Sequence, residues 1–108
     1  MTGRNLLDDL PDATQDEAFT TLLSRPGVRI ERIVSQGQVT PSGTPYDQPH
    51  DEWVLLLAGA ARLWIEDMGE QTLKPGDAIL IPAHVRHAVS WTQADPPTVW
   101  LAVHFEGA

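Results

Sequence analysis

The sequence predicts an all-β fold, an antiparallel sandwich or a small barrel, preceded by one short helix. Two observations after residue 28 lead to this class. Short segments with alternating or continuous apolar residues recur along the chain. Turn signals that contain Gly or Pro separate them at regular spacing. The length of 108 residues is sufficient for one domain with one hydrophobic core.

The N-terminal part, residues 1–27, is expected to be an extension that carries the helix. Residues 1–11 form a lead-in, and residues 12–25 have the helical pattern. Asp12 or Thr14 could cap this helix. The apolar side chains at helical spacing on one face are Ala18, Phe19, Leu22 and Leu23. A Pro-Gly pair at 26–27 would end the helix.

The remainder, residues 28–108, is expected to form the barrel domain. The predicted strands are residues 28–34, 52–57, 61–66, 71–73, 78–81, 87–91 and 98–105, with a further short one around 38–40. Two of them, which contain WVLLLA and TVWLAVHF, are apolar on both faces. A sheet with one wet face does not need such strands. We therefore expect the N-terminal helix, a second copy of the chain in a homodimer, or both to cover the outer face.

The charge balance excludes two classes of partner. Seven basic residues stand against fifteen acidic ones, and the formal net charge is −8. Binding to nucleic acid or to an anionic membrane surface needs clustered Lys and Arg, so neither partner is expected. The chain has no apolar run near the ~20 residues of a spanning helix. Its acidic N-terminus lacks an apolar signal core, so we expect a cytoplasmic protein. With no cysteine present, any metal would be held by nitrogen and oxygen.

The stretch PGDAILIPAHVRH, residues 75–87, resembles the second motif of the cupin family. That motif runs Gly, five residues, Pro, one residue, Gly, two residues, His, three residues, Asn. Gly76, Pro82 and His87 match it. His84 stands where the family usually has Gly, and Trp91 stands where it has Asn.

The first cupin motif is matched in its second half only. Glu52 and Gly59 fit the family pattern of Glu, six residues, Gly, with an apolar strand between them. The family's His-x-His pair would fall near positions 45 and 47, or 46 and 48. Neither pair contains a His, so the three-His site of the family cannot be carried over intact.

The resemblance covers about residues 28–105 and is similar to small bacterial cupins. It implies a double-stranded β-helix, or jelly-roll barrel, which in this family is often dimeric. Many cupins hold one Fe, Mn, Zn, Ni or Cu ion with three His and one Glu. The family includes dioxygenases, isomerases, lyases and non-enzymatic binding proteins, so the fold does not give the function.

By resemblance, Glu52 and His87 map onto the family's metal ligands. His50 shares strand parity with Glu52 and could point the same way. A set of two His and one carboxylate with open positions suits Fe(II), Mn or Zn, and Ni is a further candidate. Asp47 and Gln48 occupy the vacant His positions, and either could supply an oxygen ligand.

Four further residues are candidates for the rim or wall of the site. For His84 we favour a role at the rim or behind the ligands, and for His104 a structural, hydrogen-bonded role, with metal ligation as the alternative for both. Tyr46 offers a ring face near the mouth. Trp91 has the same parity as His87 and could line and narrow the pocket.

Two functions remain open from the sequence. The first is a small cupin that binds one divalent transition metal at the barrel mouth and binds or transforms a small organic molecule, as an oxygenase, isomerase or lyase. The second is a metal-free, non-enzymatic module that binds a small molecule. The cluster from Asp47 to Glu52 favours the first, and the missing His-x-His pair favours the second.

Overall fold

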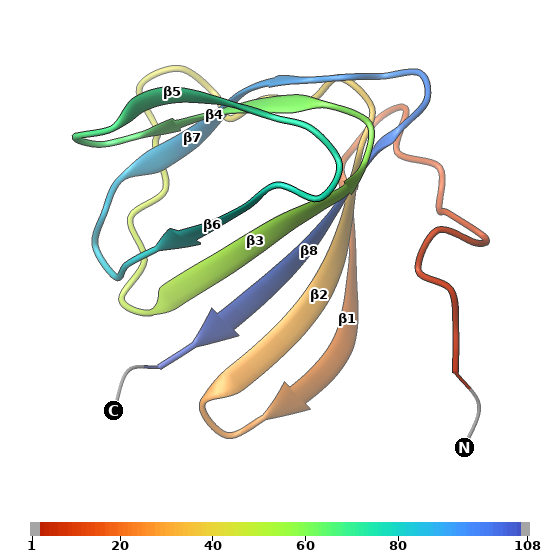
Figure 1. Cartoon of the computed structure of the whole chain (residues 1–108), viewed down its shortest axis with the longest axis horizontal. Coiled ribbons are helices and arrows are strands. Elements are labelled where there is room, and N and C mark those ends of the chain that lie inside the picture. The colour runs from red at the N-terminus through yellow and green to blue at the C-terminus, as the bar shows by residue number, and fades with distance from the viewer. Residues whose placement is uncertain (1–2, 107–108) are drawn as a thin grey trace.

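The computed structural model describes residues 3–106, and this part of the chain contains eight β-strands and no helix (Figure 1). The strands are β1 (Ala18–Arg25), β2 (Val28–Ser35), β3 (Asp51–Ala58), β4 (Ala61–Ile65), β5 (Gly69–Leu73), β6 (Ala78–Ile81), β7 (His87–Thr92) and β8 (Thr98–Phe105). Seven of the predicted strands are confirmed within one or two residues. The short strand expected near 38–40 does not form, although the Thr40 N–H donates to the Val89 carbonyl.

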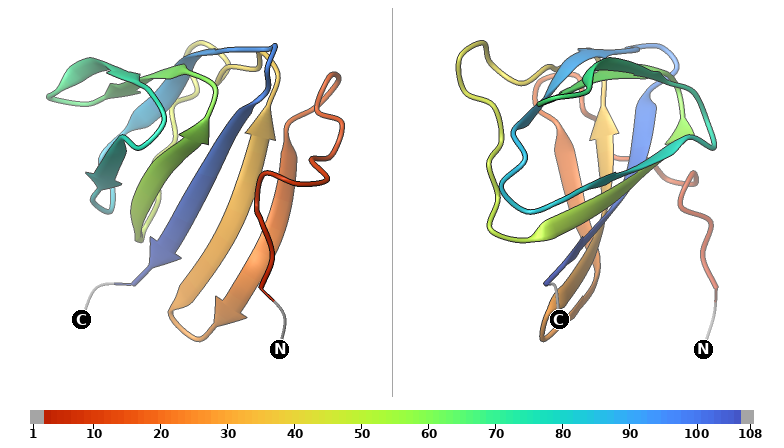
Figure 2. Two further views of the ribbon diagram at one scale, coloured as in Figure 1. Left: turned by 45° about the vertical axis from the view of Figure 1, so that its right-hand side comes forward. Right: turned by 60° about the vertical axis from the view of Figure 1, so that its left-hand side comes forward.

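The strands form two antiparallel sheets that face each other as a jelly-roll barrel (Figures 1 and 2). The large sheet has the order β1-β2-β8-β3-β6, and the small sheet has the order β5-β4-β7. Alternate residues of each strand point between the sheets and are removed from water. The buried core comprises Val54, Leu56, Ala61, Leu63, Ile65, Leu73, Ile81, Trp100 and Ala102. Nothing within residues 3–106 is a helix long and apolar enough to cross a membrane.

The helix predicted over residues 12–25 is wrong. Residues 18–25 form β1, the edge strand that pairs with β2 along its length. Exposure alternates from residue to residue between Ala18 and Leu23, which is the period of a strand and not of a helix. Thr20 and Thr21 are β-branched, and such side chains lose rotamer freedom in a helix but pack well in a sheet. Pairing with β2 also satisfies the backbone polar groups of this segment.

The N-terminal segment covers one end of the outer face of the large sheet, as an irregular chain. Ala13 is fully buried against Val34 and Val99. The Asp12 carboxylate accepts the Thr14 N–H, so the expected cap forms a local turn without a following helix. Figure 2 shows this segment outside the barrel beside β1. The cover that the doubly apolar strands demand is therefore supplied in part by the chain itself.

Two of the family's three glycine positions, 59 and 84, lie in tight turns. Gly59, between β3 and β4, has a φ of +81°, and a Cβ there would lie 2.6 Å from the Cα of Thr98. Position 84, where the family has Gly, also has a positive φ, of +63°, which explains the family preference and makes His84 an unusual occupant.

Replacing Gly59 by Ala should lower the free energy of unfolding by about 2–4 kcal/mol. The left-handed backbone costs about 1–2 kcal/mol for a residue with a Cβ, and the overlap with buried backbone adds a similar amount. Urea denaturation measures the loss. Gly43→Ala is the control, since Gly43 has a φ of +80° with open space around it. It should show only the smaller conformational cost, and equal losses in both variants would contradict the close approach at Gly59.

Candidate functional site

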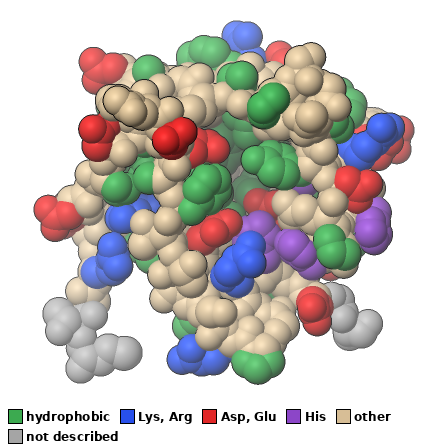
Figure 3. All heavy atoms as spheres, turned by 180° about the vertical axis from the view of Figure 1, so that it is seen from behind, with side chains coloured by type: hydrophobic (Ala, Val, Ile, Leu, Met, Phe, Trp, Pro, Cys, Tyr) green, Lys and Arg blue, Asp and Glu red, His purple; other side chains and the backbone are tan. Residues whose placement is uncertain are grey.

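A cavity of about 250 Å³ lies between the two sheets at the open end of the barrel. Figure 3 shows it from behind as a hollow with hydrophobic side chains around it and acidic, basic and histidine side chains gathered below. Its polar lining consists of Glu17, Arg29, Glu31, Tyr46, Gln48, Glu52, His87 and His104. The rest of the lining is apolar and belongs largely to the core. A polar cluster thus adjoins an apolar chamber.

Strand register brings the central residues together. Glu52 of β3 pairs directly with His104 of β8, and the inward faces of both strands continue into the core. His87 opens β7 and forms a backbone bridge with Tyr46. The rings of Tyr46 and His87 stack at 5.5 Å between centroids. The loop before β3 is thereby fixed to the small sheet, and its polar residues are held at the cavity.

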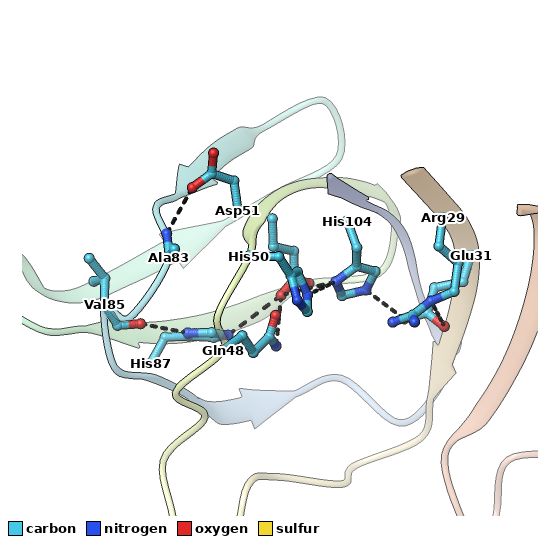
Figure 4. A network of polar contacts seen from close by, with 10 residues as sticks. Arg29, Glu31, Gln48, His50, Asp51, Ala83, Val85, His87 and His104 are labelled. Carbon is cyan, nitrogen blue, oxygen red and sulfur yellow. Dashed lines mark hydrogen bonds and ion pairs between the residues drawn. The ribbon is translucent and has the colours of Figure 1, made fainter. Parts of the chain in front are cut away.

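The Glu52 carboxylate is the centre of the cluster. Glu52 is 7% exposed, and its Oε1 lies 3.2 Å from Gln48 Nε2, 3.6 Å from His87 Nε2 and 4.0 Å from His104 Nδ1. Only the Gln48 contact is short enough for a hydrogen bond. Figure 4 shows Gln48 of the loop before β3, His87 of β7 and His104 of β8 joined in one network of polar contacts. A carboxylate buried in this way requires positive charge nearby.

The Glu52–His87 pair favours its charged form. Burial alone would raise the pKa of Glu52, but the close contact with His87, the charges of His104 and His87, and the hydrogen bond from Gln48 together hold that pKa below its ordinary value. Burial alone would lower the pKa of His87. The contact with Glu52, the Val85 carbonyl and the charges of Glu52 and Asp47 outweigh it and raise that pKa.

Hydrogen bonds on the far side of each ring fix which nitrogen faces Glu52. His87 Nδ1 lies 3.1 Å from the Val85 carbonyl oxygen, which can only accept, so Nδ1 carries the proton. In the ion pair Nε2 is protonated as well and faces the carboxylate, whereas in the neutral ring Nε2 carries the lone pair that could bind a metal. His104 Nε2 likewise donates to Glu31 at 2.8 Å. Its Nδ1 lone pair accepts from His50 Nε2 at 3.0 Å, so His104 is already occupied.

Gln48 adds an unsatisfied atom to the cluster. Its Oε1 is buried, and no described residue donates a hydrogen bond to it. Buried amide oxygens nearly always have a partner. Two lone-pair donors, Gln48 Oε1 and His87 Nε2, therefore accompany the Glu52 carboxylate. Within residues 3–106, no three His, Asp or Glu side chains gather closely enough to hold a metal, and the Gln48 oxygen is the further protein atom beside Glu52 and His87 that could ligate one.

The remaining candidates lie around this centre. Tyr46 and Gln48 line the cavity, which shows that they, and not Pro45 and Asp47, face the interior. His50 lies behind His104 and does not line the cavity. Asp47 and His84 pair with each other at 3.0 Å on the exposed rim, away from Glu52.

Trp91 points out of the barrel, contrary to the parity expectation. Arg62 pairs with Trp91 in the sheet while Leu63 pairs with Val89, so β7 contains a bulge at Ser90. The extra residue reverses the alternation after Val89. Trp91 is 41% exposed and lies under the Arg62 guanidinium at 5.6 Å from the ring centroid.

Three charged cavity residues had no signal in the sequence: Glu17, Arg29 and Glu31. Glu31 and Arg29 belong to β2, where the alternation VRIERIV places them on one face. The apolar residues Val28 and Ile30 of that strand lie on the opposite face. Only the pairing of Glu31 with Ala102 shows that these charges point inward.

The metal-free protein should be most stable, as far as this pair contributes, between pH 4.5 and 6.5. The depressed pKa of Glu52 gives stability that is fully present above its ordinary value of 4.5 and is lost as the pH falls through the folded-state value. The raised pKa of His87 gives stability that is fully present below its ordinary value of 6.5 and is lost as the pH rises through the folded-state value. Melting temperatures across pH in chelator measure this. His87→Gln should remove the alkaline loss, and an unchanged alkaline profile in that variant would contradict the assignment.

Comparison with known proteins supports the family directly. A family model of the cupin domain matches residues 32–104. The chain is 46% identical to a protein from Ralstonia eutropha JMP134 whose assignment as a mannose-6-phosphate isomerase is provisional. That match covers 99% of this chain and all of the other, with a TM-score of 0.93. A comparison with curated proteins finds no match.

More distant solved structures share the fold. A cupin superfamily protein from Desulfitobacterium hafniense DCB-2 has 19% identity and a TM-score of 0.76, over 91% of this chain and 84% of the other. A cupin from Desulfovibrio desulfuricans has 15% identity and a TM-score of 0.79, over 97% and 96%. The family model spans most of the eight-stranded barrel and includes both Glu52 and His87. This chain belongs to the cupin family.

Proposed function

We propose that this cupin binds one divalent transition metal through Gln48, Glu52 and His87 and uses its cavity to bind or transform a small organic molecule. The observation that carries the proposal is the buried Glu52 Oε1, which faces the His87 Nε2 lone pair and the Gln48 amide. Oε1 lies 3.6 Å from His87 Nε2, and the Gln48 amide oxygen, the atom of that side chain that can ligate, is buried without a donor among the described residues. Ligands about 2.0–2.2 Å from one metal are separated by about 3.0–3.5 Å. The residues present therefore fit a metal, with Gln48 in the place that His50 had in the expected set.

The surrounding residues would orient these ligands. The Val85 carbonyl sets the tautomer of His87, and Tyr46 stacks on the same ring. Such contacts behind a ligand raise its basicity and hold its direction. The apolar walls keep water from the buried carboxylate. A bound metal would act as a Lewis acid that polarises an oxygen of the organic ligand.

Isomerisation of a carbonyl compound is the reaction class that we propose. It requires a base that moves a proton between carbons beside a polarised oxygen. With one carboxylate oxygen of Glu52 on the metal, its other oxygen would act as this base, while His87, bound through Nε2, would only hold the metal. The isomerase assignment of the 46% identical relative supports this choice of class.

A metal-free binding protein is the second candidate. It is favoured by the absence, among residues 3–106, of three His, Asp or Glu side chains close enough to form a metal site. The Glu52–His87 ion pair can satisfy itself through its shifted pKa values. In this alternative the pair would anchor a polar group of the ligand.

Metal content measured by plasma mass spectrometry tests the proposal. Tag-free protein incubated with Fe(II), Mn, Ni or Zn and then desalted should retain about one metal per chain. His87→Gln should lose it, because the variant lacks the imidazole ligand. His50→Gln is the matched control and should keep the metal, since His50 contacts only His104 in this cluster. Wild-type protein without metal in all four incubations would leave the metal-free candidate.

A further inference from the structure

We propose that the cavity takes an uncharged small molecule with an apolar body and rejects phosphate esters. This proposal shares one assumption with the proposed function, namely that the ligand binds in the same cavity. It differs from the phosphorylated sugar in the provisional name of the R. eutropha relative. The inference follows from the charges and surfaces that line the cavity, with or without a metal.

The charges of the lining are mainly negative. Glu17, Glu31 and Glu52 face the cavity, and Arg29 is the one Lys or Arg side chain of the lining. With His87 protonated, as in its ion pair with Glu52, three carboxylates, one guanidinium and one imidazolium leave a net charge of −1, and with His87 neutral, as a metal ligand, the net charge is −2. Arg29 Nε already lies 3.9 Å from Glu31. A divalent metal would bring the total only to zero, which leaves no excess positive charge for a phosphate dianion.

The acidic groups are held in place by neighbouring side chains. Glu17 accepts a hydrogen bond from the fully buried Ser35, whose oxygen in turn accepts the Trp100 indole N–H. Glu31 accepts from His104. A phosphate ester entering the cavity would therefore meet fixed carboxylates that cannot turn away. Like charges placed this close reject a ligand strongly.

The groups that usually bind phosphate do not line this cavity. Phosphate sites use helix N-termini, Lys or bidentate Arg. The described chain has no helix, and the lining contains no Lys. The formal charge of the whole chain, −8, adds a repulsive field for anions at a distance.

The chamber beyond the polar cluster suits an apolar body. Its walls are side chains of Ile33, Val54, Leu63, Ile81, Val89 and Trp100. Figure 3 shows hydrophobic side chains on both sides of the hollow. An apolar part of the ligand would be removed from water there, while one polar oxygen could reach Glu52, His87 and Gln48. A sugar phosphate offers no apolar part of this kind.

Two fluorescent probes with the same ring system test the proposal. 2-Acetylnaphthalene is uncharged and carries a carbonyl, whereas 2-naphthyl phosphate is a dianion. Titrations are made in chelator, so that the metal proposal has no influence on the result, and mannose 6-phosphate is added as a third ligand. We expect saturable binding of 2-acetylnaphthalene, binding of 2-naphthyl phosphate at least about tenfold weaker, and no binding of mannose 6-phosphate.

Paired variants assign the selectivity to the cavity. Glu17→Gln keeps the shape and removes one charge, so it should strengthen binding of 2-naphthyl phosphate about threefold or more and leave 2-acetylnaphthalene unchanged. Glu70→Gln is the matched control, because Glu70 also accepts from a serine, Ser90, but on the outer surface. Equal or tighter binding of either phosphate, no binding of 2-acetylnaphthalene, or equal effects of the two variants would overturn the proposal.

Discussion

Glu52→Gln should lower the affinity for Zn(II) at least about 100-fold while the barrel stays folded. Losing a residue that only supports a ligand costs about 10–100-fold, and losing a charged ligand costs more. The substitution keeps the size of the side chain and its contact with Gln48, but it removes the negative charge that attracts the cation. Competition with a chromogenic chelator at pH 7 measures the affinity.

Asp51→Asn is the matched control for this variant. Asp51 is the adjacent carboxylate, but its Oδ1 accepts the Ala83 N–H at 2.8 Å, outside the cavity. An asparagine oxygen can keep that hydrogen bond. The control should bind Zn(II) like the wild type. Equal affinity of the Glu52→Gln variant and the wild type would contradict the role of Glu52 as ligand.

The barrel could be predicted because local signals and global pairing agree over most of the chain. Alternating apolar residues and turns with Gly or Pro placed seven strands within one or two residues. Gly59 and Pro82 also anchored the resemblance to the family. Gly59 has a reason visible in the structure, since a Cβ at this position would overlap the backbone of Thr98. Such positions are fixed by backbone geometry and so leave a clear pattern in the sequence.

The N-terminal helix was predicted wrongly because its pattern was ambiguous. Ala18, Phe19, Leu22 and Leu23 fit a helical face, but the burial of β1 follows period two with a bulge near Thr21 and Leu23. An edge strand forms because it pairs with its neighbour in the sheet. The pairing of β1 with β2 is a tertiary contact, and the local sequence of residues 12–25 does not reveal it.

The site was predictable where it rested on motif positions and unpredictable where it rested on register. Glu52 and His87 lie together as the resemblance implied. His104 has the hydrogen-bonded role favoured from the sequence, with Glu31 and His50 as partners, but its place beside Glu52 follows from the pairing of β3 with β8, which joins residues far apart in sequence. Trp91 was misplaced by a single bulge. One inserted residue changes which side chains of a strand face the cavity. Counting alternate residues along the sequence does not show where such a bulge lies.

The outer face of the large sheet predicts the oligomeric state of the protein. Cross-strand rows there are apolar and partly exposed, with Trp53 between Leu80 and Val103 and Leu55 beside Leu101. The N-terminal segment covers only the end near Val34 and Val99. We propose that a second copy of the chain covers the rest. The only charge in these two rows is Arg32 beside Leu101, which is 3% exposed and donates to the Leu6 carbonyl, so two copies can meet on the exposed apolar part despite the net charge of −8.

The wild type should therefore sediment as a dimer at micromolar concentration, and Leu80→Arg should weaken the dimer at least about tenfold. Leu80 is 53% exposed beside Trp53, and an arginine there would lose hydration in an apolar interface without gaining a partner. Met68→Arg is the control, since Met68 is 57% exposed in the turn between β4 and β5 on the other sheet. A monomeric wild type, or equal weakening of the dimer by both variants, would contradict a dimer interface on this face. A dimer lost only in Leu80→Arg would explain why β3 and β8 are apolar on both faces, since one face builds the cavity and the other would join the two barrels.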